Sequence, residues 1–219
     1  MRTFGINLSR TFIIASLVLF IFTGCNSVNA PSFAGTVLSQ APAATDFTLL
    51  DQFGETITLA DYKNQVVVLT FVYTACNDIC PLIAHRLKEA EKYLIDAADE
   101  IAILLISVDP DRDTVSNRQE FLNSYGMVTK WKYLVGQEQE LEDIWSAYYV
   151  SSLINESDAY SGQSNSRDAL ETELLNNYSV THQGPVYLID RTGHARSIFT
   201  LPFDSKDLAN DIKLLVKEN

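Results

Sequence analysis

Two segments of the chain, residues 66–72 and 101–108, are apolar at almost every position. A run without polar alternation is typical of a central strand that is buried on both faces of a sheet. Between the two runs, apolar residues recur at helical spacing from Ile83 to Leu94. The pattern therefore predicts a buried strand, a helix and a second buried strand.

The rest of the chain continues this alternation. A short N-terminal hairpin is predicted over residues 47–59. Later elements are a helix over 113–125, a strand over 131–135, a helix over 141–148, a hairpin over 186–199 and a helix over 204–217. This order predicts an α/β domain with a partly parallel central sheet flanked by helices.

One polar segment interrupts the order. Residues 150–181 are dominated by Ser, Asn, Asp and Glu, and only 166–178 has helical spacing of apolar residues. Loops of about thirty residues are uncommon inside a compact domain and are often functional. We therefore expect an inserted loop before the last hairpin, ending at His182.

The first residues resemble an export signal. Arg2 and Arg10 give a positive start, and the apolar stretch over 11–22 has a usual signal length, too short to span a bilayer as a helix. A small residue and then Cys25 follow, which resembles the lipobox of bacterial lipoproteins, where the cysteine is lipidated. An uncleaved N-terminal anchor is the alternative. Under both interpretations the domain is held at a membrane, outside the cytoplasm, on the periplasmic side.

The chain thus divides into a signal peptide over 1–24, a tether over 25–44 and a domain over 45–219. The tether is rich in Ser, Asn, Ala and Pro, and it lacks charged residues, which predicts flexibility. The domain is long enough to bury an ample core. The net charge is −12 and no Lys/Arg cluster interrupts it, which argues against nucleic acid as a partner.

Two cysteines carry the most distinctive chemistry. Cys76 and Cys80 form a C-x-x-x-C pair directly after the first apolar run, and the only other cysteine is Cys25. Such a pair can be a soft-metal clamp, a redox couple or a plain disulfide. Pro81 favours a helix start near Cys80, where the helix dipole would lower the pKa of the thiol. On a regular helical turn the Cβ atoms would lie ~5–6 Å apart, beyond the ~3.8 Å that a disulfide prefers, so the geometry favours a metal without excluding a bridge.

A metal would need further ligands, and the chain has three histidines. His85 falls on the helix face opposite Ile83, and His194 lies in a turn, so both are expected at the surface. His182 precedes the predicted strand over 186–189, which is expected beside the first strand. From its position alone, His182 can be a ligand or a purely structural residue.

Three blocks of the sequence together resemble the signatures of the Sco/SenC proteins. They are F-V-Y-T-x-C-x-D-I-C-P over residues 71–81, S-V-D-P-D-R-D-T over 107–114, and His182 eight residues before Asp190. The resemblance covers nearly all of residues 45–219. It implies a thioredoxin-like fold in membrane-anchored, copper-binding proteins that help to build the dinuclear copper (CuA) centre of cytochrome c oxidase.

Carried over to this chain, the resemblance implies that Cys76, Cys80 and His182 are copper ligands. It implies that Asp78 is a weak ligand or lies directly beside the ligands. The stretch 109–114 is expected to shape a loop and cap a helix rather than to bind metal.

The chain departs from the family pattern at two positions near these residues. Asn77 stands where the family often has proline. Gly184 takes the place of the proline that borders the dithiol in redox thioredoxins, which disfavours a general disulfide reductase.

Three functions remain open at this point. The first is a copper metallochaperone that binds Cu(I), or Cu(II) with His182, and delivers it by ligand exchange to the CuA-bearing subunit of cytochrome c oxidase. An oxidised pair cannot ligate copper as thiolates, so the redox state would gate this transfer. The second is a membrane-tethered thiol-disulfide reductase acting on that partner, in which Cys76 attacks and Cys80 resolves. The third is a tethered adaptor that carries a structural disulfide.

Overall fold

The computed structural model describes residues 32–155, 179–182 and 184–218, and at 152–155, 179, 181 and 182 it describes the backbone alone. The unit Phe33–Asn219 is compact. The signal expected over 1–24, Cys25 and the helix expected over 166–178 lie outside the described residues. Within the part of the chain that is described, no helix is both long and apolar enough to cross a membrane.

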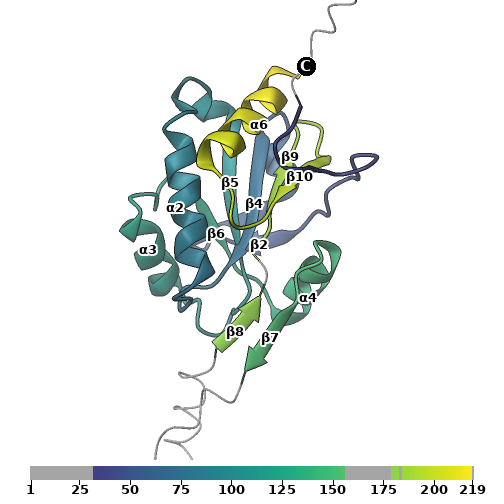
Figure 1. Ribbon diagram of the computed structural model, residues 1–219. Helices are drawn as coiled ribbons and strands as arrows, with labels where there is room; N and C mark the ends of the chain where they lie inside the picture. Colours follow the sequence, from purple (N-terminus) through teal and green to yellow (C-terminus); the bar gives the residue numbers. More distant parts are fainter. Residues whose placement is uncertain (1–31, 156–178, 183, 219) are drawn as a thin grey trace, which may run out of the picture. The chain divides into compact units, whose positions relative to one another are not determined.

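A six-stranded mixed sheet forms the centre of the fold (Figure 1). Its strands, in spatial order, are β1 (Thr36–Val37), β10 (Ala195–Phe199), β9 (Val186–Ile189), β4 (Val66–Val72), β5 (Ile101–Ser107) and β6 (Lys132–Leu134). The strands β4, β5 and β6 run parallel, whereas β9, β10 and β1 each pair antiparallel with their neighbours. The predicted α/β class and its mixed sheet are confirmed.

The strand β4 lies inside the sheet, and all seven of its residues are buried, as its unbroken apolar run predicts. It pairs with β5 over its full length, from Val66 opposite Ile101 to Val72 opposite Ser107. The two strands therefore end at the same edge of the sheet, and the loops that follow them begin side by side.

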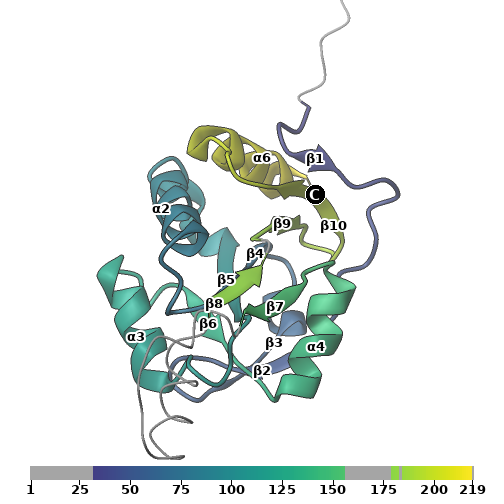
Figure 2. The same ribbon diagram turned by 60° about the horizontal axis from the view of Figure 1, so that its bottom comes forward.

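Helices cover both faces of the sheet (Figure 2). They are α2 (Ile79–Glu91), α3 (Val115–Ser124), α4 (Glu138–Ala147) and α6 (Ser205–Lys217), with short 3-10 helices at Leu59–Tyr62 and Ile95–Glu100. The helices α2 and α6 pack together along one face. The helix α4 lies on the other face (Figure 2). The ring of Tyr148, which follows α4, packs on Phe71 of β4 with 5.6 Å between ring centroids.

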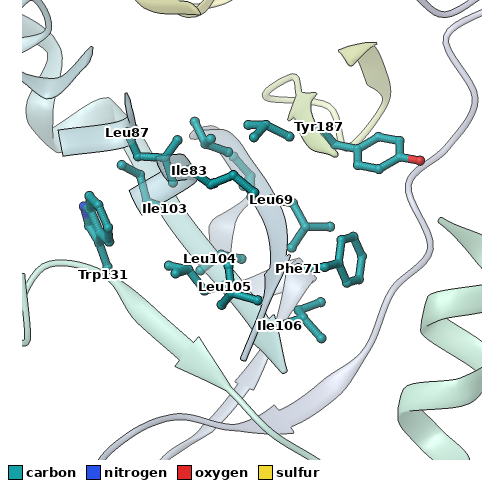
Figure 3. Close-up of a cluster of buried hydrophobic side chains, with 14 of the residues drawn as sticks. Leu69, Phe71, Ile83, Leu87, Ile103, Leu104, Leu105, Ile106, Trp131 and Tyr187 are labelled. Atoms are coloured by element: carbon teal, nitrogen blue, oxygen red, sulfur yellow. The ribbon is translucent and has the colours of Figure 1, made fainter. Parts of the chain in front are cut away.

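The apolar residues at helical spacing form the buried face of α2, as predicted. Figure 3 shows Ile83 and Leu87 of this helix beside Ile103 of β5 in a cluster of buried side chains. This packing holds the helix firmly against the sheet, and with it the residues of its first turn.

Two small hairpins accompany the sheet. They are β2 (Thr48–Leu50) with β3 (Thr56–Thr58), and β7 (Ser152–Asn155) with β8 (Ser179–His182). The first is the predicted N-terminal hairpin. The second lies within the expected insertion: residues near the two ends of the segment 150–181 pair with each other, which the sequence analysis did not predict. Such pairing is made by backbone groups, so a Ser/Asn-rich sequence shows little sign of it.

The segment 33–44 belongs to the folded unit, in contrast to the flexible tether expected over 25–44. The amides of Ala34 and Gly35 donate to the buried carboxylate of Asp211, at 2.8 and 2.9 Å. Next along the chain, β1 pairs with β10. These contacts also use backbone groups, so the folded unit begins earlier than the composition indicates.

A chain that begins at residue 45 should be less stable than one that begins at residue 33. The shorter chain lacks β1 and the two amides that donate to Asp211, and a buried polar group that loses its partners costs about 1–3 kcal/mol. Urea unfolding followed by circular dichroism measures the difference. Equal free energies of unfolding would show that the segment adds no stability.

Candidate metal centre

The loop over residues 73–78 connects β4 to α2 and brings the two cysteines together. The Cys76 amide donates to the Tyr73 carbonyl at 3.3 Å, and the Cys80 amide donates to Cys76 Sγ at 3.4 Å. The two thiols also hydrogen-bond each other. Cys76 is 6% exposed, Cys80 is fully buried, and no disulfide joins them. The pair is therefore a buried dithiol at the beginning of a helix.

The environment of Cys80 differs from the sequence expectation. Burial raises the pKa of the Cys80 thiol, and the hydrogen bond with Cys76 raises this pKa further. The helix dipole favours the thiolate by only about 0.3–1 kcal/mol. Full burial can disfavour the thiolate by about 4–7 kcal/mol, so burial outweighs the dipole. Cys80 therefore stays protonated at neutral pH until a cation takes the place of the proton.

Asp78 is an exposed residue that directly precedes α2, and its side chain makes no capping hydrogen bond. Its expected place beside the metal ligands remains a prediction. Among the side chains that the structure describes, no three from Cys, His, Asp and Glu lie together as ligands of one ion. The side chain of His182 is outside this set, so the expected third ligand is placed here by its backbone alone.

The strand β8, which ends at His182, lies beside the cysteine loop, below the beginning of α2 in Figure 1. The Val180 backbone hydrogen-bonds the Tyr73 hydroxyl, which also hydrogen-bonds Cys76. Burial is the main reason that the pKa of Tyr73 is raised to about 12, so this hydroxyl stays neutral near pH 7. Tyr73, the first residue of the cysteine loop, thus links this loop to the strand that carries His182.

Gly184 comes two residues after His182 and lies against the first turns of α2. A Cβ at this position would be 2.3 Å from Ile83 Cδ1 and 3.3 Å from Ile79 Cδ1. Glycine therefore allows the chain to approach the helix that carries Cys80. The departure from the family pattern at this position has a reason in packing.

Asp113 has contacts that could not be predicted from the sequence, and it is only 1% exposed. Its Oδ1 accepts hydrogen bonds from the amide (2.8 Å) and the hydroxyl (2.6 Å) of Thr74. Its Oδ2 accepts from the hydroxyls of Ser107 (2.6 Å) and Tyr133 (2.7 Å). Burial raises the pKa of Asp113, and these hydrogen bonds act in the opposite direction. The sequence indicates Asp113 only as part of the family block over 107–114, and that block does not specify which residues the carboxylate contacts.

The rest of the stretch 109–114 shapes a loop and caps a helix, as predicted. Arg112 Nε donates to Asp109 Oδ2 at 2.5 Å, and the guanidinium lies over the Tyr73 ring, 5.6 Å from its centroid. Thr114 caps α3 by accepting from the amide of Asn117 at 3.2 Å. This stretch therefore supports the cysteine loop from the side of β5.

The other two histidines lie at the surface, as predicted. His85 is exposed on α2, on the side away from the buried Ile83. The side chain of His194 is 45% exposed and hydrogen-bonds the Thr192 hydroxyl at 2.8 Å.

A mixed sheet covered by helices, with a dithiol where the helix after the inner strand β4 begins, defines a thioredoxin-like protein. The sequence model of the SCO1/SenC family matches residues 35–217. The chain belongs to the SCO1/SenC family, which confirms the resemblance carried by its three motifs.

Relatives and solved structures agree with this assignment. SCO2-like protein RP587 of Rickettsia prowazekii is 26% identical over 162 residues, which are 74% of this chain and 71% of that protein. The structure of Bradyrhizobium japonicum ScoI with copper bound is 26% identical, with a TM-score of 0.63 over 79% of this chain and 99% of that one. BsSco, described as a member of the Sco family of cytochrome c oxidase assembly proteins, has the same fold, with a TM-score of 0.61 and 20% identity over 82% and 96% of the two chains.

Gly184→Ala should lower the stability of the domain and loosen β8. The added methyl group must displace Ile83 or the chain that follows His182, and an oversized residue in a packed core costs about 1–3 kcal/mol. Urea unfolding measures the first effect, and amide hydrogen exchange at Val180 measures the second. Unchanged values in both would contradict the tight approach to α2.

Proposed function

We propose that the protein binds copper through Cys76, Cys80 and His182, and passes it to the dinuclear copper (CuA) site of cytochrome c oxidase. The observation that carries the proposal is the buried, unbridged dithiol beside the strand that ends at His182. The fold relative ScoI of Bradyrhizobium japonicum, 26% identical, has been solved with copper bound.

The donor set fits copper. Thiolates are soft ligands that select Cu(I), and imidazole also suits Cu(II). Calcium and magnesium prefer oxygen ligands, which a dithiol does not supply. A closed structural zinc site uses four protein ligands, whereas the proposed set has three. Three ligands leave an ion open to a partner, as cargo requires.

His182 supplies the third ligand in this proposal. Residues two apart in a strand share a face, so position 182 lies on the face of β8 where Val180 is buried. The hydrogen bond between Tyr73 and the Val180 backbone keeps this strand at the cysteine loop. Gly184 keeps the next part of the chain against α2.

Transfer proceeds by ligand exchange. The partner is the CuA-bearing subunit of cytochrome c oxidase, in keeping with the description of BsSco as an assembly protein for that enzyme. Cys76 is the less buried of the two thiols, so exchange with the partner's ligands begins at its sulfur. Asp78 is exposed at the beginning of α2 and acts as a weak ligand or neighbour during this exchange.

Lipidation of Cys25 holds the protein at a membrane outside the cytoplasm in this proposal. The support is the signal-like start of the chain and the small residue that precedes Cys25. A membrane attachment fits a protein that serves a membrane-bound oxidase.

A thiol-disulfide reductase is the second candidate, because the dithiol is unbridged and one of its members lies in the first turn of a helix. Cys76 would attack the partner's disulfide and Cys80 would resolve the mixed disulfide. The reductase has no need of His182, whereas copper binding is tighter with it as the third ligand.

Reduced wild-type protein should take copper in stoichiometric amount from a chromogenic Cu(I) chelator under anaerobic conditions. Cys76→Ser should abolish this binding, and His182→Ala should weaken it by about tenfold or more. His85→Ala is the matched control, because His85 is exposed on α2 and outside the proposed site, and it should bind like the wild type.

Failure of the reduced wild type to compete for copper would overturn the chaperone proposal. Reduction of a disulfide substrate that needs Cys76 and proceeds equally well in His182→Ala would then favour the reductase. A wild type that shows neither copper binding nor disulfide reduction would leave the adaptor with a structural disulfide.

Cys25→Ser should move the protein from the membrane fraction to the soluble fraction of the cells that produce it. Labelled fatty acid should be incorporated into the wild type and not into the variant. A wild type that is membrane-bound but unlabelled would indicate the uncleaved N-terminal anchor instead.

A further inference from the structure

We infer that Asp113 is a positioning residue for Cys76: its carboxylate holds the cysteine loop in the conformation that binds copper tightly. The inference rests on the proposed function and names a residue outside the proposed ligand set. The supporting geometry is that the two oxygens of this carboxylate accept hydrogen bonds from different parts of the fold, one from the cysteine loop and the other from the sheet.

One oxygen of Asp113 binds the loop, and the other binds the sheet. Oδ1 accepts both hydrogen bonds from Thr74, two residues before Cys76. Oδ2 accepts from Ser107, the last residue of β5, and from Tyr133 in β6. The buried carboxylate therefore ties the beginning of the cysteine loop to two strands that are fixed by the core.

The site requires a carboxylate rather than an amide. Four donors converge on the two oxygens of Asp113, and an asparagine offers only one acceptor oxygen. The side-chain NH2 group of that asparagine would face hydroxyl groups that donate to the carboxylate of Asp113 in the wild type. The Ser107 hydroxyl already accepts from the Asp109 amide at 3.0 Å, so it would need to exchange its donor role for a second acceptor role.

The position of Cys76 depends on the turn that this network begins. The Cys76 amide closes the turn on Tyr73, and Cys76 Sγ in turn accepts from the Cys80 amide. A shift at Thr74 would therefore pass to both thiols. Replacing a residue that orients a metal ligand without binding the metal itself typically lowers the metal affinity by about 10–100-fold.

Asp113→Asn tests the inference, with Asp211→Asn as the matched control. Asp211 is equally buried and likewise accepts hydrogen bonds with both oxygens, but its donors are the two backbone amides of Ala34 and Gly35 in the N-terminal segment. Thr74→Val removes one hydrogen bond to Asp113 and keeps the amide, and Thr74→Ser restores the hydroxyl. Each variant is first shown to be folded by circular dichroism.

Two readouts are measured on this set of variants. The first is the Cu(I) dissociation constant from chelator competition, which should rise about tenfold or more in Asp113→Asn and less in Thr74→Val. The second uses no copper: amide hydrogen exchange at Thr74 and Cys76, and the alkylation rate of the reduced thiols, should increase in the same two variants. Thr74→Ser and Asp211→Asn should match the wild type in both readouts.

The copper-free readout separates this inference from the proposed function. If the wild type binds no copper, the proposed function fails, and the exchange and alkylation rates still decide whether Asp113 positions the loop. Equal rates in Asp113→Asn and Asp211→Asn at equal loss of thermal stability would overturn the inference, because Asp113 would then be only a structural residue.

Discussion

The parallel pairing of β4 with β5 is the constraint on which the site depends. Because Val72 stands opposite Ser107, the loop that carries Cys76 and the turn that carries Asp113 leave the sheet side by side. The strand β9 runs antiparallel to β4, so the chain that enters it from His182 arrives at the same edge. Three segments that are far apart in the sequence therefore meet without any direct attraction between the cysteines and the histidine.

Elements that bury apolar residues could be predicted from the sequence, because burial produces a recognisable pattern: a continuous apolar run in a strand buried on both faces, and helical spacing in a helix buried on one face. The runs over 66–72 and 101–108 and the spacing from Ile83 onward identify the central strands and α2 in this way. The cysteine pair was equally visible, since cysteines are rare in this chain. The α/β class and the position of the dithiol follow from these features, and the thioredoxin-like fold follows from the family resemblance.

The features that could not be predicted depend on backbone pairing or on three-dimensional burial. The β7–β8 pairing and the segment 33–44 engage backbone amides and carbonyls of these segments, which every residue type except proline provides in full. The raised pKa of Cys80 results from complete burial, which local helix geometry does not reveal. Asp113 reaches Thr74 across 39 positions of the chain, a contact that no local motif specifies.

The pairing of β7 with β8 makes the backbone register at His182 independent of the length of the chain between the two strands. Asn155 pairs with Ser179 at the end of the two strands that leads into the connecting segment, and Ser152 pairs with His182 at the opposite end, next to the proposed site. This pairing sets the backbone register at position 182. A change in the number of residues that connect Asn155 to Ser179 is therefore expected to leave that register unchanged.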